Sequence, residues 1–330
     1  MQQALDEAWK YQAVTYPNPP VGAVIVDEKD SFVALGAHYE AGFAHAELEC
    51  VKNALLYYGK SDIKDIKDPN KLHLYILKNY KNIFKGHTIY VTLEPCTHQG
   101  RTPSCSQLLK EMGFSRVVIS SHDIDPNASG GYEFLLKNTK VDIGILSEKS
   151  DKLLSIFKAT QKNKKFVFFK VAVSKNGVYT GGIISSQTSR ELVHNLRQKI
   201  DLLVIGGKSV RVDRPTLDTR LIDGTNPPDI LIYSKRDDFD KTIPLFGIKN
   251  RKVFISDSLK IVEDYKFIMI EGGENLFKAV KSSCDMFMIF KSDKIQDGNS
   301  FRFEKSLKRL NSFKYFDDTI EWYVKEDDGT

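Results

Sequence analysis

Hydrophobic residues recur along the first half of the chain at two different spacings. Residues 1–12 and the segment that starts at His45 carry apolar side chains every three or four positions, the spacing of one helical face. Short apolar stretches predict strands at 21–26, 32–37, 88–93, 116–120 and 141–145. Further helices are expected at 103–112, which Gly113 ends, and at 131–137. This alternation predicts an α/β domain whose sheet is covered by helices on both faces.

A second α/β pattern begins after residue 165. Residues 151–165 contain five lysines and little periodicity, and an unbroken apolar strand follows at 166–173. We therefore expect two domains, 1–146 and 147–330. Strands are predicted at 202–205, 229–233, 252–255, 267–270, 286–290 and 320–324, and helices at 189–198 and 274–281. In the first domain, residues 60–85 are rich in Lys and Asp and interrupt the alternation, so we interpret them as a surface insertion.

Composition narrows the class of protein. A length of 330 residues with 41% hydrophobic residues suits two domains. The 48 Lys and Arg against 43 Asp and Glu leave a net charge of +5, too small to predict a surface for nucleic acid. The apolar stretches are strand-sized, the first residues do not resemble a secretion signal, and four cysteines do not form a disulfide framework. We therefore expect a soluble, cytoplasmic protein with neither a membrane nor a nucleic acid as its partner.

Three residues with soft donor atoms fall at the ends of predicted elements. His45 begins a helix, Cys96 follows a strand, and Cys105 lies near a helix start that Thr102 and Pro103 mark as N-cap and first helical residue. Zinc prefers imidazole and thiolate ligands, and a catalytic zinc keeps three protein ligands so that water can take the fourth position. His45, Cys96 and Cys105 are therefore candidate ligands of a catalytic zinc.

Glu47 supplies a carboxylate close to this candidate site. The order His45-x-Glu47, then Pro-Cys96, then a second cysteine matches the signature of zinc deaminases, in which the glutamate is the general acid/base. The alternative is a purely structural zinc, which a fourth Cys or His normally closes. We interpret the other two cysteines, Cys50 and Cys284, as buried thiols.

Four motifs together resemble one enzyme family. Residues 18–22, 36–38, 45–47 and above all 92–105, which read Thr-Leu-Glu-Pro-Cys-Thr-His-Gln-Gly-Arg-Thr-Pro-Ser-Cys, are similar to the bifunctional deaminase/reductase of riboflavin biosynthesis. The resemblance implies an N-terminal domain of the cytidine-deaminase type, with a three-layer α/β/α fold. It also implies zinc-dependent hydrolytic deamination of 2,5-diamino-6-(5-phosphoribosylamino)pyrimidin-4-one.

The loop between the two candidate cysteine ligands is longer than the two residues usual in nucleobase deaminases. It carries His98, Arg101 and Thr102. An imidazole, a cation and a hydroxyl at a helix N-terminus suit a phosphate group. By resemblance these three residues hold the ribose phosphate, and Asn18 and His38 contact the pyrimidine and the sugar.

The resemblance extends over nearly the whole chain. Residues 203–220 and 270–276 are similar to the reductase domain of the same family, which has a dihydrofolate-reductase-like α/β fold and uses NADPH to reduce the ribosyl group to ribityl. The resemblance implies that Lys170 and Asp213 are catalytic. It assigns NADPH to Val173, Ser209, Asp213, Ser234 and Gly273, and the substrate to Arg197, Leu217, Arg220 and Glu271.

The second domain departs from the family at two places. Asn176 stands where relatives have an aspartate, and the loop after Gly177 is short. Two other functions stay open at this point: a zinc deaminase that acts on a nucleobase or nucleic acid and carries a vestigial second domain, and a non-enzymatic zinc-stabilised interaction module. The first predicts a basic, aromatic-lined groove beside the zinc, whereas an intact Glu47 disfavours the second. A homo-oligomer is compatible with the sequence.

Overall fold

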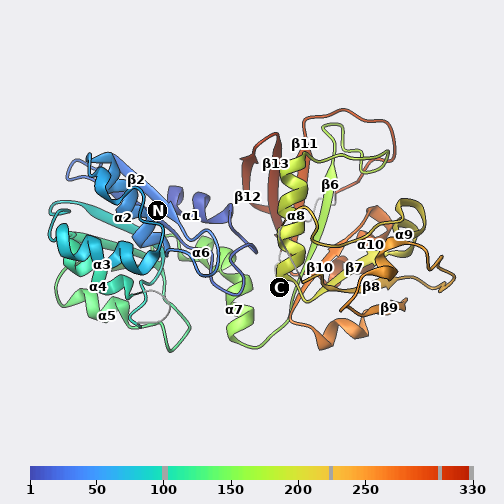
Figure 1. Cartoon of the computed structure of the whole chain (residues 1–330), viewed down its shortest axis with the longest axis horizontal. Helices are drawn as coiled ribbons and strands as arrows, with labels where there is room; N and C mark the ends of the chain where they lie inside the picture. The colour runs from blue at the N-terminus through green and yellow to red at the C-terminus, as the bar shows by residue number, and fades with distance from the viewer. Residues whose placement is uncertain (99–102, 223–225, 304–306, 327–330) are drawn as a thin grey trace. The chain divides into compact units, whose positions relative to one another are not determined.

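The chain folds into two compact α/β units (Figure 1). The computed structural model describes residues 1–98, 103–222, 226–303 and 307–326. The N-terminal unit comprises Met1–Lys162 and the C-terminal unit comprises Asn163–Thr330. Within the described residues, none of the helices combines the length and the apolar character that crossing a bilayer requires.

The N-terminal unit is built on a five-stranded sheet in the order β2-β1-β3-β4-β5. Its strands are β1 (Gly22–Val26), β2 (Phe32–Ala37), β3 (Thr88–Leu93), β4 (Arg116–Ser121) and β5 (Lys140–Ile143). Its α-helices are α1 (Gln2–Trp9), α2 (Ala46–Tyr57), α3 (Pro69–Asn79), α4 (Cys105–Met112), α5 (Gly131–Leu136), α6 (Ser147–Leu153) and α7 (Ser155–Gln161). β1 and β2 form the expected antiparallel hairpin, while β3, β4 and β5 are parallel.

Alternate residues of these strands point to opposite faces of the sheet. Ile25 and Ile119 belong to a core cluster that also contains the buried residues of α2, α3, α4 and α5. Their neighbours Val24 and Val118 are buried on the other face, where α1 packs on β1, β2 and β3, and α6 packs on β4 and α1. The unit therefore has three layers, helices–sheet–helices.

The first unit ends later than the boundary that the sequence suggested at 146/147. Helices α6 and α7 fill the segment in which no clear period was visible, and they belong to the N-terminal unit. The hydroxyl of Ser150 donates to the carbonyl of Thr92, and Gln12 donates to the carbonyl of Leu153. These two bonds attach α6 to the rest of the unit.

The segment 60–85 is more than a surface insertion. It contains the 3₁₀ turn η1 (Ser61–Ile63) and helix α3, whose N-cap Asp68 accepts a hydrogen bond from the Lys71 amide. Ile63, Leu72 and Ile76 are at most 2% exposed and lie in the core cluster. The lysines and aspartates stay at the surface, so the charged composition concealed an apolar face.

The C-terminal unit has an eight-stranded sheet in the order β12-β13-β11-β6-β10-β7-β8-β9. The strands are β6 (Phe166–Val173), β7 (Leu202–Gly206), β8 (Asp229–Tyr233), β9 (Val253–Ser256), β10 (Phe267–Glu271), β11 (Met286–Ser292), β12 (Leu307–Tyr315) and β13 (Asp318–Lys325). Six strands from β9 to β11 in this order are parallel, and β13 and β12 add antiparallel ribbons at one edge.

Helices α8 (Gln187–Lys199), α9 (Gly207–Asp213) and α10 (Glu274–Val280) accompany this sheet, with 3₁₀ turns η2 (Pro244–Gly247), η3 (Lys260–Asp264) and η4 (Lys281–Ser283). The chain leaves β6 and returns as β7 beyond β10, while β11 lies on the opposite side of β6. Such a reversal of strand order opens a crevice at the carboxyl ends of the strands, where α/β sheets bind ligands.

Candidate metal centre and nucleotide cavity

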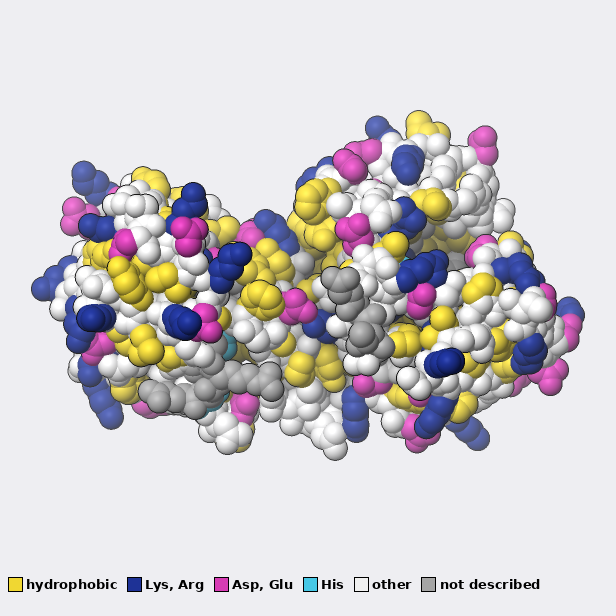
Figure 2. All heavy atoms as spheres, viewed as in Figure 1, with side chains coloured by type: hydrophobic (Ala, Val, Ile, Leu, Met, Phe, Trp, Pro, Cys, Tyr) yellow, Lys and Arg dark blue, Asp and Glu magenta, His cyan; other side chains and the backbone are white. Residues whose placement is uncertain are grey.

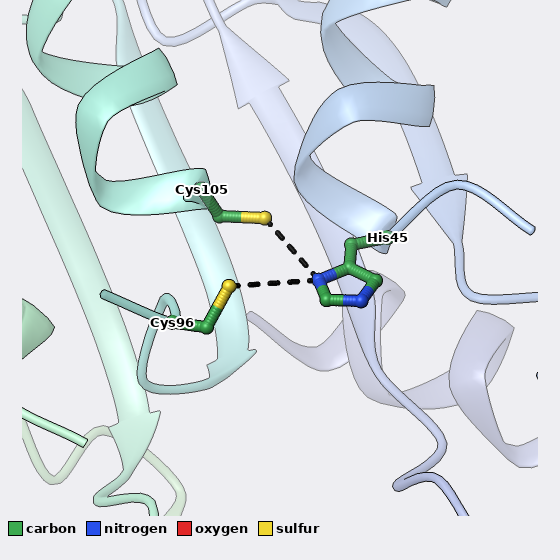
Figure 3. A group of neighbouring side chains, drawn as sticks. All are labelled: His45, Cys96 and Cys105. Carbon is green, nitrogen blue, oxygen red and sulfur yellow. Dashed lines mark hydrogen bonds between the residues drawn. The ribbon is translucent and has the colours of Figure 1, made fainter. Parts of the chain in front are cut away.

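The predicted soft ligands converge in the N-terminal unit. His45 Nδ1 lies 3.7 Å from Cys96 Sγ and 3.4 Å from Cys105 Sγ (Figure 3). The donor atoms of all three residues lie within 4.8 Å of one another, and both cysteines are buried. The fold therefore places the predicted ligands His45 and Cys105 next to each other although they are 60 positions apart in the sequence.

Element ends position each of the three side chains. His45 is the N-cap of α2, Cys96 follows β3, and Cys105 is the first residue of α4. The N-cap of α4 is Ser104, whose hydroxyl accepts a hydrogen bond from the Gln107 amide. The expected helix start at Pro103 is thus wrong by two residues, because Ser104 supplies the capping oxygen. Cys105 still lies at the positive end of the helix, but its contact with Cys96 and its burial raise the pKa of its thiol.

The spacing of the three donors fits a zinc ion. Zn–S bonds of about 2.3 Å and a Zn–N bond of about 2.0 Å in a tetrahedron imply N···S separations of about 3.5 Å. The observed separations of 3.4 and 3.7 Å bracket that value. Within the described parts of the chain this is the only cluster of three such ligands, and it offers three ligands rather than four. The donor set is that of a catalytic zinc rather than of a closed structural one.

Glu47 lies in the first turn of α2 and is 4% exposed. Burial and the nearby charge of Cys96 raise the pKa of Glu47 to about 7, and the carboxylate is within hydrogen-bonding reach of Cys105. A carboxyl group with this pKa can both accept and release a proton near neutral pH.

Asn18 and His38 lie beside the metal cluster as a hydrogen-bonded pair. Asn18 Nδ2 is 3.0 Å from His38 Nε2, and His38 Nδ1 is 2.9 Å from the carbonyl of Ala44. The carbonyl can only accept, so Nδ1 carries the proton and Nε2 accepts from Asn18. Burial lowers the pKa of His38 to about 4, which keeps the ring neutral, and its ring centroid is 5.5 Å from that of His45.

The remaining predicted residues of this site lie on the loop between the cysteines. His98 is exposed at the end of the described part of that loop. Arg101 and Thr102 lie outside the described residues.

Glu94 lies in the motif at residues 92–105, but the sequence did not assign it a role. Its carboxylate accepts hydrogen bonds from the amides of Asp123, Gly130 and Tyr132 and lies 3.0 Å from His122 Nδ1. These bonds fix the loop after β4 against the segment that carries Cys96. The sequence shows an acidic residue two positions before a ligand cysteine but shows neither its burial nor its backbone partners, so it gave no signal for this role.

His73 is a second residue that the sequence did not single out. It lies on α3 in the inserted segment and is 1% exposed. Burial lowers the pKa of His73 to about 4, and the side chain is near enough to Cys96 and His45 for their charges to act on it. The insertion therefore reaches toward the metal cluster.

In the C-terminal unit, Lys170, Arg197 and Glu271 form a buried charge cluster. Lys170 on β6 is the register partner of Glu271 on β10, and Arg197 of α8 pairs with Glu271 at 2.8 Å. Burial opposes ionisation of Glu271, but the charges of Arg197 and Lys170 outweigh it and lower the pKa of this carboxyl. Glu271 Oε1 and Arg197 Nε are buried and have no hydrogen-bond partner in the described structure. Buried unpaired polar atoms are rare, so this cluster fits a bound polar ligand.

Leu217 and Arg220 lie on the loop after α9. His194 lies between this loop and the charge cluster, because it interacts with both. His194 Nδ1 accepts a hydrogen bond from the Leu221 amide, and His194 interacts electrostatically with both Arg197 and Arg220. Arg220 is exposed and pairs with Asp218 at 3.0 Å, whereas Leu217 is buried with a φ of 56°.

Arg251 stabilises this loop and was not predicted. Its guanidinium donates to the carbonyls of Thr216, Leu217 and Leu245. No motif in the sequence marked this residue.

A cavity of about 320 Å³ lies at the carboxyl ends of β7, β8 and β10. Ser209, Asp213 and Gly273, all assigned to NADPH, line it. Val173 is the buried last residue of β6. Ser234 follows β8, and its hydroxyl donates to the carbonyl of Arg236. The described residues that line the cavity include neither Val173 nor Ser234. The cavity therefore fits part of a dinucleotide and leaves the roles of Val173 and Ser234 as predictions.

Asn176 serves as a turn residue. Its side-chain oxygen accepts from Ser174 Oγ and the Gln296 amide, and its nitrogen donates to the Gln296 carbonyl. An amide can satisfy all three bonds, because it both donates and accepts, whereas an ionised carboxylate only accepts. The exchange of aspartate for asparagine is therefore explained by local structure.

Charged side chains are distributed over both units. On the face that Figure 2 shows, Lys and Arg are interspersed with Asp and Glu in the described part of each unit. A basic surface of the kind that a nucleic acid needs is not gathered on this face.

Comparisons with known proteins find similar sequences over most of the chain. The zinc-binding region of cytidine and deoxycytidylate deaminases matches residues 1–121. Riboflavin biosynthesis protein RibD of Aquifex aeolicus is 33% identical over 69% of this chain and 59% of its own length. The protein of the same name from Actinobacillus pleuropneumoniae is 31% identical over 81% of this chain and 66% of its own length. The chain thus spans less than two thirds of these curated relatives.

A solved structure resembles the whole chain. The diaminohydroxyphosphoribosylaminopyrimidine deaminase/5-amino-6-(5-phosphoribosylamino)uracil reductase of Thermotoga maritima is 25% identical, with a TM-score of 0.60, over 98% of this chain and 97% of that one. The predicted N-terminal α/β/α domain of the cytidine-deaminase type and the second α/β domain are confirmed.

Proposed function

We propose that this chain, which belongs to the family of riboflavin biosynthesis protein RibD, is a zinc-dependent pyrimidine deaminase joined to an NADPH-dependent reductase. The proposed substrate is 2,5-diamino-6-(5-phosphoribosylamino)pyrimidin-4-one, which is deaminated and then reduced from ribosyl to ribityl. We also propose that it acts in the cytoplasm and binds this small molecule rather than nucleic acid. The observation that carries the proposal is the three-ligand cluster of His45, Cys96 and Cys105 beside buried Glu47.

Each residue of the deaminase site has a defined task. His45, Cys96 and Cys105 would hold Zn²⁺, which when bound activates water for hydrolysis. Glu47 takes a proton and delivers it to the departing ammonia, a role supported by its burial and near-neutral pKa.

Substrate recognition is assigned to residues around the cluster. Asn18 and His38 would bind the pyrimidine and the sugar, because their mutual hydrogen bond fixes the direction of donors and acceptors. His98, Arg101 and Thr102 would bind the ribose phosphate.

The reductase reaction is assigned to the crevice of the C-terminal unit. NADPH would contact Val173, Ser209, Asp213, Ser234 and Gly273, and when bound it supplies the hydride. Arg197, Leu217, Arg220 and Glu271 would hold the substrate, an assignment that the unpaired buried atoms of Arg197 and Glu271 support. Lys170 and Asp213 would be the catalytic residues; burial lowers the pKa of Lys170 and raises that of Asp213, so both can exchange protons closer to neutral pH.

Metal analysis combined with ammonia release tests the deaminase. Cys96→Ser should lose most of its zinc and its deamination, because two ligands hold a tetrahedral ion far less tightly than three. The matched control is Cys50→Ser, a buried cysteine of the same unit that is not in the cluster. A full equivalent of zinc in Cys96→Ser would contradict the assignment.

NADPH consumption by the full chain tests the reductase. We expect the wild-type protein to oxidise NADPH only when the deaminated product is supplied, and Asp213→Asn to be slower by roughly 10²-fold or more, the usual contribution of a general acid/base. Unchanged turnover in Asp213→Asn would remove this residue from the catalytic set, and absence of any NADPH binding would remove the reductase.

A further inference from the structure

One wall of the nucleotide cavity is an aromatic ring that the assigned residues do not include. Tyr179 lies on the loop after β6 and lines the cavity together with Gly273 and Asn299. Its amide donates to the carbonyl of Asn299 at 3.0 Å, so the backbone of the loop is fixed at this residue.

The ring of Tyr179 contacts two neighbouring residues, Gly273 and Phe301. A Cβ atom at Gly273 would lie 2.0 Å from Cε2 of Tyr179, so the ring packs directly on the glycine backbone. Phe301, which is 5% exposed, meets the ring edge-to-face with centroids 5.7 Å apart. The glycine is therefore required by the tyrosine, and the ring is fixed before any ligand binds.

The hydroxyl and the free side of the ring are available to a ligand. The hydroxyl makes no hydrogen bond with the described residues, and the ring is only partly buried. A planar, partly exposed, immobilised aromatic surface in a cavity suits a flat heteroaromatic group.

The position of Tyr179 after β6 determines which half of a dinucleotide it can contact. Tyr179 follows β6, the strand that pairs with β10 and places Lys170 opposite Glu271. The other end of the cavity is formed by the first turn of α9 and by Tyr233 at the end of β8. Hydride transfer needs the donor ring within contact distance of the substrate, and the substrate is assigned to Arg197 and Glu271. The nicotinamide therefore belongs at the β6–β10 end.

We propose that Tyr179 positions the nicotinamide ring of NADPH by packing against it. The inference rests on the proposed reductase function and adds a residue that sets the orientation of the cofactor. The adenosine half would lie toward the first turn of α9 and toward β8, out of reach of Tyr179.

Binding measurements on the full chain test this assignment. NADPH and 2′,5′-ADP, which lacks the nicotinamide half, are titrated into wild type and into Tyr179→Phe, Tyr179→Leu and Tyr179→Ala. We expect the Leu and Ala variants to weaken NADPH about 10-fold, the order of one aromatic contact, and to bind 2′,5′-ADP as wild type does. Tyr179→Phe should retain NADPH affinity, because the ring is preserved.

One control variant and the pattern of losses separate the possible failures. Phe316→Leu removes an exposed aromatic ring of the same unit that is not among the described residues lining the cavity, and it should leave NADPH affinity unchanged. Wild type that binds neither ligand would refute the reductase proposal and this inference with it. Wild type that binds both, with Tyr179→Leu weakening neither ligand or both equally, would leave the reductase standing and refute the role of Tyr179. A Phe variant as weak as the Ala variant would refute packing by the ring.

Discussion

Replacing Glu47 by Gln should lower the rate of ammonia release by roughly 10²- to 10⁴-fold, the contribution of a general acid/base. The amide has nearly the same volume as the carboxyl group, so packing around this 4% exposed side chain is preserved. Glu47 is not one of the clustered metal ligands, so the variant should retain its zinc. The measurement is ammonia release under saturating substrate, with zinc content determined on the same sample.

Glu49→Gln is the matched control, because Glu49 lies in the first turn of the same helix and is only partly buried. It should leave both zinc content and deamination nearly unchanged. Near-normal ammonia release from Glu47→Gln would mean that another group carries the proton. Loss of zinc from Glu47→Gln would instead mean that the carboxylate supports the metal cluster.

The metal cluster could be predicted because its chemistry depends on residue types at element ends. His45 caps a helix, Cys96 follows a strand, and both positions are visible in the hydrophobic pattern. Parallel strands and the helices that follow them bring such ends to one edge of a sheet. The pattern therefore predicted both the ligands and their convergence.

Elements whose stability comes from tertiary contacts were missed. β12 has side chains that are partly exposed on both faces, so it shows no alternation, and it exists because it pairs with β13. α9 begins with Gly207 and has only seven residues, too few to be stable as an isolated helix. In the inserted segment, lysines and aspartates outnumber the few apolar residues of α3 that pack into the core.

Residues that act through backbone groups were also invisible to sequence reasoning. Arg251 binds three carbonyls, and Glu94 binds three amides, and any residue can supply such groups. Their partners leave no mark in the sequence. Residues with charged partners could be identified from the sequence. The family resemblance assigned Lys170, Arg197 and Glu271 to the second site, and these three residues form one cluster.

This cluster leads to the largest expected effect on stability. Arg197→Met should destabilise the C-terminal unit by about 3 kcal/mol, because removal of one partner leaves the other charge buried. Both side chains of the Arg197–Glu271 pair are 12% exposed, and Lys170 and His194 would be left to balance the carboxylate. The double variant Arg197→Met with Glu271→Gln should recover part of the loss, since the stranded charge is then absent.

Arg214→Met is the matched control. Its pair with Asp240 has the same 2.8 Å separation, but the side chains are 47% and 48% exposed. Exposed pairs contribute about 0–1 kcal/mol, so this variant should unfold almost as wild type does. Unfolding in urea can be followed through Trp322, which is buried in the C-terminal unit, after Trp9 of the N-terminal unit is replaced by Phe.

The effect of Arg197→Met should depend on pH in a defined direction. The pKa of Glu271 is lower in the folded chain than its ordinary value, so the unfolded state binds the proton more readily. The stabilisation is therefore fully present above the ordinary glutamate pKa of about 4.3 and is lost as the pH falls through the folded value. The stability gap between wild type and Arg197→Met should narrow on acidification below about pH 4. A gap that stays constant into that range would show that Arg197 stabilises the unit by packing rather than by its charge.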